Sequence, residues 1–161
     1  MKWMQKIAVL ALIVVFAGAV NLGSARDANA QATFDRSTLN IETADGRHEF
    51  DIELALNQNQ QAQGLMFRQE LAKNAGMLFF HQRERVASMW MRNTFVPLDM
   101  LFVARDGRIV HIVERTVPQS LTTITAGIPV RAVLEVNAGT VGRLAIKPGD
   151  RLIHPLFGNA E

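Results

Sequence analysis

The fold is organised around one stretch, Ser88 to Val103, which reads SMWMRNTFVPLDMLFV. It begins with a tryptophan between two methionines and continues through a polar bend at residues 92–94. After a proline, the run from Leu98 to Ala104 is apolar except for one carboxylate, Asp99, which is the pattern of a buried strand. The sequence therefore predicts a bend beside a buried strand, with a groove for a ligand near Trp90 to Asp99.

Two Asp-Gly pairs in the chain predict β-hairpins. Asp45-Gly46 precedes a strictly alternating segment, His48 to Leu56, with apolar residues on one face and acidic residues on the other. Alternation after an Asp-Gly turn is typical of an antiparallel sheet with one buried and one wetted face. The pair at 106–107 predicts a second hairpin, between Leu98–Ala104 and Ile109–Arg115.

One helix is predicted, over Gln58 to Met66. Asn57 is a suitable N-cap, and the segment is rich in Gln and Ala and contains no β-branched residue. Gly64 lies near its end, where a left-handed residue often terminates a helix. Between Asn137 and Leu144 we expect a helical turn at most.

The remaining segments are short strands and their connections. Strands are predicted at 39–41, 76–80, 86–91, 130–136 and 151–154, a polar turn at 81–84, and an exposed loop at 116–127. Closely spaced short strands without strand–helix alternation predict a mostly β (β-rich α+β) fold. We expect a compact barrel-like or rolled antiparallel sheet with one or two short helices.

Residues 1–30 form a segment of their own. Lys2 and Lys6 precede an apolar run, Ile7 to Val20, and the segment ends in Ala28-Asn29-Ala30. This order predicts a secretory signal peptide cleaved after Ala30. A membrane anchor is the alternative, but the run is shorter than the roughly 20 apolar residues of a span. We therefore expect a periplasmic or secreted protein, free of the membrane after cleavage, with a single β-rich domain at 31–161.

Charge and cysteine content exclude several function classes. Of 17 basic and 15 acidic residues, three basic and one acidic lie in residues 1–30, so residues 31–161 are formally neutral. No basic surface is left to indicate a nucleic-acid partner. The chain contains no cysteine, which excludes disulfides, thiol catalysis and zinc–thiolate sites.

Three blocks of sequence carry a resemblance to a known family. They are ELALNQNQQAQGLMFRQELAKNAGMLFF, MWMRNTFVPLDMLFVARDGRIV and VLEVNAGTVGRLAIKPGDRL, between Glu53 and Leu152. Their order and their GLMFR, GMLF, WM-x-NT-x-x-PLD and LE-x-x-AG motifs resemble the domain of unknown function 192. Arg92 stands where a lysine is usual in that family, a change that keeps the charge. The resemblance implies a small β-barrel-like domain, often exported in bacteria, with no settled activity.

Asp99 and Glu135 are carboxylates set in apolar strands. A buried carboxylate costs several kcal/mol unless it is paired or hydrogen-bonded. For Asp99 we expect Arg68, Arg92 and Asn93 as partners, which would make it a structural ion pair or a cap for the bend. The alternative is a carboxylate that faces a ligand, and Glu135 carries the same two alternatives.

Trp90 is either a core anchor or an aromatic platform lining a groove. Together with Arg68, Asn93, Asp99 and Glu135 it makes up the predicted ligand-binding set. One shared network satisfies several polar groups more easily than separate sets of partners. We therefore expect these five side chains to converge on one region.

Metal and nucleophile patterns are weak. Met89 and Met91 share one face of the predicted strand and thioethers suit Cu(I), but methionines at such positions are typical core residues. The four histidines form no H-x-H or H-x-x-x-H pair, and no serine of residues 31–161 lies in a G-x-S-x-G elbow. We expect no metal site and no cofactor.

These observations favour a ligand-binding or accessory module for a small molecule or an envelope ligand. One alternative is a small hydrolase acting on cell-envelope material, with Asp99 and Glu135 as an acid–base pair. The other is a structural or interaction module without a ligand. The sequence identifies neither a catalytic residue nor a protein partner.

Overall fold

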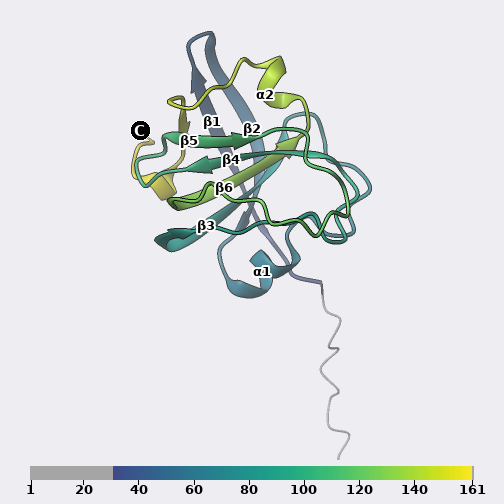
Figure 1. Cartoon of the computed structure of the whole chain (residues 1–161). Coiled ribbons are helices and arrows are strands. Elements are labelled where there is room, and N and C mark those ends of the chain that lie inside the picture. The colour runs from purple at the N-terminus through teal and green to yellow at the C-terminus, as the bar shows by residue number, and fades with distance from the viewer. Residues whose placement is uncertain (1–30, 161) are drawn as a thin grey trace, which may run out of the picture. The chain divides into compact units, whose positions relative to one another are not determined.

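The computed structural model describes residues 31–160, so the predicted signal peptide lies outside the described residues. The predicted β-rich fold is confirmed: seven strands form one mixed, strongly curled half-barrel sheet with two short helices (Figure 1). The strand order is β5-β4-β6-β3-β2-β1-β7. The strands are β1 (Asp35–Thr43), β2 (Gly46–Ala55), β3 (Ala75–Val86), β4 (Leu98–Val103), β5 (Ile109–Val113), β6 (Pro129–Asn137) and β7 (Arg151–Ile153).

One strand pair departs from the antiparallel sheet predicted from the sequence. β2 and β3 run parallel, with Asp51 opposite Ala75 and Ala55 opposite Phe79, whereas all other pairs are antiparallel. Parallel neighbours need a crossover connection, which α1 (Gln58–Gln63) and the loop after it supply. This crossover places α1 beside the point where β2 leaves the sheet.

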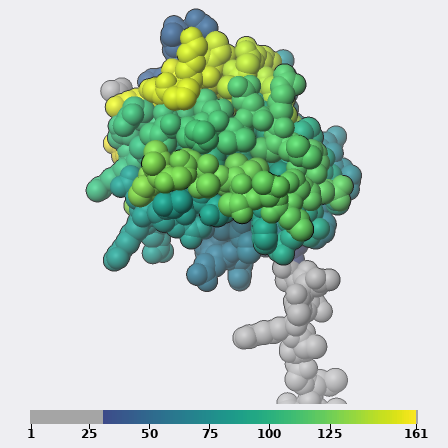
Figure 2. Space-filling model, viewed as in Figure 1, coloured from purple at the N-terminus to yellow at the C-terminus, as the bar shows by residue number. Residues whose placement is uncertain are grey.

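The two edge strands of the sheet meet. Arg108 and Arg151 form a bridge, flanked by hydrogen bonds of 2.8 Å from Ile109 N to Asp150 O and from Leu152 N to Gly107 O. Gly107 has a φ of 86°, and a Cβ on it would lie 2.4 Å from the Leu152 carbonyl oxygen, so this contact requires glycine. The Asp-Gly pair predicted as a turn therefore also allows the sheet to curl onto itself. In Figure 2 the yellow C-terminal residues lie along the upper edge of the domain.

Each face of the sheet covers its own hydrophobic core. On β4, Leu101 belongs to the core inside the curled sheet and Met100 to the core on the other face. The first core draws on all seven strands and on residues near α2 (Thr140–Arg143). The second lies beneath the segments that carry Leu65, Ala87, Met91 and Val96. The bend predicted from the sequence thus covers the outer core.

The strand boundaries around residue 85 differ from those predicted. β3 runs through the predicted polar turn at 81–84, and its register with β6 shifts between Phe80 and Arg85. Its last five residues, 82–86, are exposed, which explains their polarity without a turn. The predicted strand at 86–91 was wrong, because this segment forms only a single bridge, between Met89 and Ile124.

The predicted helix is confirmed, although it ends at Gln63. Asn57 Oδ1 accepts from Gln60 N at 3.0 Å and Gln60 Oε1 accepts from Asn57 N at 3.2 Å, which is a capping box. Gly64 follows with a φ of 50°. α1 and α2 lie at opposite ends of the view in Figure 1. Within residues 31–160, no helix has the length and hydropathy needed to cross a membrane.

Candidate functional site

Asp99 is fully buried, and its carboxylate binds backbone amides. Oδ1 accepts a hydrogen bond from Arg115 N and Oδ2 one from Val141 N in α2, both at 2.9 Å. Hydrogen bonds from two amides satisfy a buried carboxylate without a counter-ion. Asp99 therefore holds α2 and the segment after β5 against β4.

The partners predicted for Asp99 lie elsewhere. Arg68 forms a two-pronged ion pair with Glu53 at 3.1 and 2.5 Å. The guanidinium carbon of Arg92 lies 4.2 Å above the centre of the Trp90 ring. The predicted pairing of Asp99 with an arginine was therefore wrong. Asp99 binds backbone amides instead, and the sequence does not reveal such partners, because every residue except proline carries a backbone N–H.

Glu135 points away from Asp99, toward the other face of the sheet. Asp99 pairs with Val136, whereas Glu135 pairs with Met100 of β4 and Met77 of β3. Paired residues share a face and successive residues alternate, so the two carboxylates lie on opposite faces. A glycosidase-type pair must flank one cleft. The predicted acid–base pair of Asp99 and Glu135 is therefore wrong.

Glu135 lies at a small pocket of about 60 Å³ on the outer face of the sheet. Its walls come from α1 and the residues after it, from Phe79 of β3, and from the segment after β3. We call this the Glu135 pocket; it is lined by Gln61, Ala62, Gln63, Gly64, Leu65, Met66, Phe79, Ser88, Met89, Trp90, Thr94 and Glu135.

Within residues 31–160, Glu135 forms no ion pair, and its carboxyl oxygens are not fully enclosed, because the one enclosed side-chain atom without a hydrogen-bond partner is His81 Nε2. Only 4% of the residue is exposed. Burial raises the pKa of Glu135 from 4.5 to about 8, because the charged form loses its hydration and gains no counter-ion. At neutral pH the pocket therefore holds a predominantly neutral carboxylic acid.

One exposed aromatic side chain lines the Glu135 pocket, and two more directly follow lining residues in the sequence. Trp90 is 46% exposed and lines the pocket. Of the two alternatives for Trp90, a core anchor or an aromatic platform at a surface, the structure shows the second. Phe67 and Phe95 are also exposed and pack edge to face, with ring centres 6.5 Å apart. Solvated aromatic rings next to a buried acid make an amphipathic surface that suits a ligand.

The segments that carry these aromatic residues are locked together by strained backbone. Phe67 and Asn93 both have a positive φ, of 65° and 54°, and Phe67 N donates to Asn93 O at 2.8 Å. Gln119 also has a positive φ and donates its N–H to Thr94 O at 3.1 Å. Such conformations cost free energy and often occur at functional sites.

Of the five predicted ligand-binding residues, the structure brings three together. Glu135 and Trp90 line one pocket, and Asn93 Nδ2 lies 4.0 Å from the sulfur of Met66, which lines it as well. Arg68 does not line this pocket but a separate hollow that also includes Glu53. Asp99 is on the opposite face of the sheet. The prediction that all five side chains converge on one region was therefore wrong. For Trp90, Asn93 and Glu135, a role in ligand binding stays a prediction.

The structure also brings together a serine and a histidine that sequence analysis missed. Ser37 Oγ lies 2.9 Å from Nε2 of His154, which is 3% exposed. His154 Nδ1 accepts a hydrogen bond from Leu156 N at 3.2 Å, so the ring proton lies on Nε2 and is donated to Ser37. A general base for a serine nucleophile must instead accept its proton. The pair therefore ties β1 to the C-terminal segment and does not form a catalytic dyad.

The methionines considered as copper ligands are mostly part of the outer core, with Met91 inside it and Met89 packed against it. Met91 is fully buried, and its sulfur accepts a hydrogen bond from Thr116 Oγ1 at 3.2 Å. Met89 lines the Glu135 pocket with Met66. Among the described residues, no group of three or more His, Asp or Glu side chains is arranged to hold a metal ion.

Sequence analysis missed the α1 side of the Glu135 pocket. Gln61, Gln63 and Met66 line it, yet they lie in a segment that reads as an ordinary capped helix. The sequence offered one signal, the glycine at position 64; in the structure it has a positive φ, and a Cβ on it would lie 2.9 Å from the Phe79 ring. A glycine that allows such close packing marks the contact between α1 and β3, beside which the pocket opens.

Comparisons with known proteins agree with this fold. A family model for the domain of unknown function 192, described as an uncharacterised ACR, matches residues 40–154. A solved structure from Sinorhizobium meliloti 1021, provisionally described as a transcription regulator, is 45% identical, with a TM-score of 0.76 over 78% of this chain and 98% of that one. A protein of unknown function from Novosphingobium aromaticivorans is 40% identical, with a TM-score of 0.72 over 76% and 94% of the two chains. No curated protein matches the sequence.

Proposed function

The chain belongs to the domain of unknown function 192 family, and on that premise we propose that it is a ligand-binding module whose Glu135 pocket receives a cationic group of a small molecule. The observation that carries this proposal is the Glu135 carboxyl, which is buried at a pocket and forms no ion pair within residues 31–160. A buried acid without a partner destabilises the fold. A ligand that supplies the counter-charge would remove that cost.

The Glu135 pocket has the chemistry to bind an ammonium or guanidinium group. A cation at the carboxyl would favour its ionised form and displace the proton that it holds at neutral pH. Thioethers of Met66 and Met89 and the Trp90 ring line the same space and suit a weakly hydrated cation. The Arg92 guanidinium already lies 4.2 Å from the centre of this ring, so the ring accommodates a cation on one face, and a ligand's cation would need the other face or the ring edge.

The dimensions of the pocket define the rest of the ligand. A volume of about 60 Å³ holds a head group but no larger body. Outside the pocket, a ligand would meet the exposed ring of Trp90, and the exposed residues Phe67 and Phe95 directly follow the lining residues Met66 and Thr94. The surface therefore suits a cationic head group on an apolar or aromatic body, with Glu135 as the single charged anchor.

The description of the Sinorhizobium relative as a transcription regulator does not change this proposal. α1 has six residues and α2 has four, which is shorter than a helix that reads the major groove. Residues 31–161 are formally neutral, whereas DNA-binding domains are usually basic. Neither feature supports a nucleic-acid partner.

Export is part of the proposal. A cationic start, a short apolar run and the Ala28-Asn29-Ala30 exit support cleavage after Ala30 and a periplasmic or secreted location. Intact-mass measurement of protein exported by a bacterial host tests this. A mature chain that begins at Gln31 is expected, and a product that retains residues 1–30 in the membrane would contradict it.

Binding can be followed by fluorescence, because Trp90 is the only tryptophan of residues 31–161. Agmatine, which carries both an ammonium and a guanidinium group, serves as the probe. It should change Trp90 emission saturably in the wild type and not in Glu135→Gln, which keeps the shape of the side chain but cannot ionise. Glu49→Gln, at an exposed position of β2, is the matched control and should bind like the wild type. Equal binding by wild type and Glu135→Gln would reject the pocket.

A further inference from the structure

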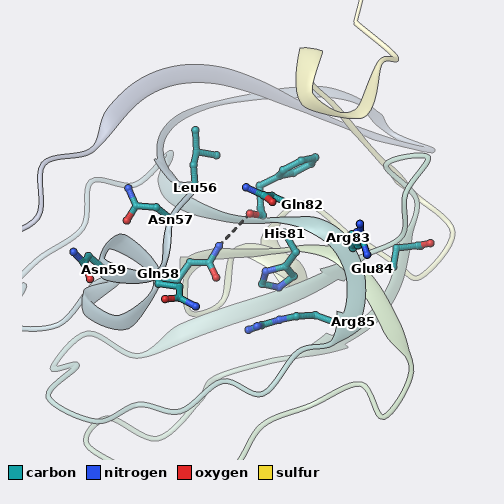
Figure 3. A pocket seen from close by; sticks show the side chains of 11 residues that line it. Leu56, Asn57, Gln58, Asn59, His81, Gln82, Arg83, Glu84 and Arg85 are labelled. Carbon is teal, nitrogen blue, oxygen red and sulfur yellow. Dashed lines mark hydrogen bonds between the residues drawn. The ribbon is translucent and has the colours of Figure 1, made fainter.

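A further hollow opens beside the start of α1, where β2 and β3 separate. The ladder between them ends at the pair of Ala55 and Phe79, after which β2 turns into α1 and β3 continues to Val86. The space between these two segments has a volume of about 860 Å³. Figure 3 shows it with the side chains of Leu56 to Asn59 on one side and those of His81 to Arg85 on the other. Gln61 donates to the carbonyls of both Ala55 and Phe80 at 3.1 Å, which closes the end of the ladder.

Two arginines line this hollow, and a third lies beside it. Arg83 and Arg85 line it from β3. Arg131 of β6 approaches through a 2.6 Å hydrogen bond to Gln82 O and lies 4.8 Å above the Phe80 ring. Within residues 31–160, none of the three is within salt-bridge distance of a carboxylate. Glu84 is the one acidic residue in the lining, so the positive charge of the hollow exceeds its negative charge.

A buried histidine lies among these charges. His81 is 5% exposed and lines the hollow, and its Nε2 has no hydrogen-bond partner among the described residues. Burial and the nearby charges of Arg85 and Arg131 lower the pKa of His81 to about 4, so the ring is neutral at pH 7. Orphaned buried polar atoms are rare, because each forgoes the hydrogen bonds that water would supply. Something that binds in the hollow would give this nitrogen a partner.

We propose that this hollow is an oxyanion-binding site, which takes a phosphate or carboxylate group carried by a small polar molecule. Guanidinium forks match the oxygens of both groups. The imidazole of His81 offers a further hydrogen bond at the buried end. The opposite wall carries the amides of Asn57, Gln58 and Asn59, which suit hydroxyl groups on the rest of the molecule. The site is separate from the Glu135 pocket and its charge preference is opposite, although Gln61 lines both.

The test follows the His81 ring protons by NMR while inorganic phosphate or glucuronate is added at constant ionic strength. A saturable shift is expected, together with a rise in the His81 pKa, because a bound anion offsets the charges of Arg85 and Arg131. A shift with phosphate alone or glucuronate alone identifies the group that the site prefers, and a shift with both indicates a general oxyanion site. No saturable shift with either up to tens of millimolar would overturn the proposal.

Substitutions distinguish anion binding at this specific site from general electrostatic attraction of anions to the protein. Arg83→Gln with Arg85→Gln should weaken phosphate or glucuronate binding at least about tenfold, a change in binding free energy of about 1.4 kcal/mol. Both arginines are exposed, so the double variant should fold. Arg36→Gln, at an exposed position of β1, removes charge elsewhere and should leave binding unchanged. Equal weakening by both variants would also overturn the proposal.

Discussion

The backbone N–H of Phe67 donates a 2.8 Å hydrogen bond to the carbonyl of Asn93, and both residues have a positive φ. This contact joins the segment after α1 to the bend after Trp90, so the two sides of the Glu135 pocket are held in one arrangement. The left-handed conformation is unfavourable for most residues with a Cβ, so it costs more at Phe67 than at Asn93, because asparagine tolerates it best. The rim of the pocket is therefore built at a cost in backbone strain.

Substitutions at Asn93 should report that strain. Asn93→Val should destabilise the domain by about 1–2 kcal/mol, because a β-branched residue tolerates the left-handed region poorly. Asn93→Gly keeps the backbone hydrogen bond, accepts the same φ and should leave stability close to that of the wild type. Urea denaturation of the two variants checks this. Equal stability of Asn93→Val and the wild type would contradict the account of the rim.

Asp99→Ala should be strongly destabilising without affecting ligand binding directly. It leaves the buried N–H groups of Arg115 and Val141 without acceptors, which should cost about 2–5 kcal/mol in total. Asp51→Ala, on the exposed face of β2, is the matched control and should change stability by less than about 0.5 kcal/mol. Chemical denaturation measures both. A loss below about 1 kcal/mol for Asp99→Ala would show that its two hydrogen bonds do not hold α2 in place.

The sequence predicted the hairpins, the capped helix and the β-rich class, because these follow from local patterns. The alternation of β2 and the Asp-Gly turns are readable within ten residues, and so is the N-cap at Asn57. The parallel pairing of β2 and β3 was not predicted, because it depends on a crossover that no local pattern encodes.

The candidate site was predictable only in part, for the same reason. Trp90 and Glu135 stood out as amphipathic or polar residues in apolar surroundings, and they do line one pocket. Asp99 gave the same signal although it lies on the opposite face. The sequence cannot distinguish a carboxylate that accepts hydrogen bonds from two backbone amides from one that has no partner. The reason is that almost every residue carries a backbone N–H, whatever its side chain.

The stability of the domain should depend on pH through Glu135. Its pKa is raised from 4.5 to about 8 in the folded state, so between these values the folded state holds a proton that the unfolded state has lost. The free energy of unfolding should therefore fall as pH rises from 4.5 to 8, by up to about 1.4 kcal/mol per pH unit. Glu135→Gln, which stays neutral, should lack this contribution. Parallel pH profiles for the two proteins would contradict the raised pKa.

Arg68 should contribute to stability and not to binding at the Glu135 pocket. Its ion pair with Glu53 is partly exposed, so Arg68→Gln should cost no more than about 1 kcal/mol. The fluorescence change of Trp90 with agmatine should be the same as in the wild type. Loss of agmatine binding in a folded Arg68→Gln protein would instead place Arg68 in the site, as the sequence predicted.

The ionisation of Glu135 itself tests the binding proposal most directly. The measurement is a pH titration of the Glu135 carboxyl carbon by NMR, with and without agmatine, with Glu135→Gln to assign the resonance. We predict a pKa of about 8 for the free domain, because burial disfavours the carboxylate, and a clearly lower pKa with agmatine, because the bound cation favours it. A Glu135 pKa in the usual range for glutamate, unchanged by agmatine, would contradict the claim that this carboxyl is the anchor for a cationic ligand.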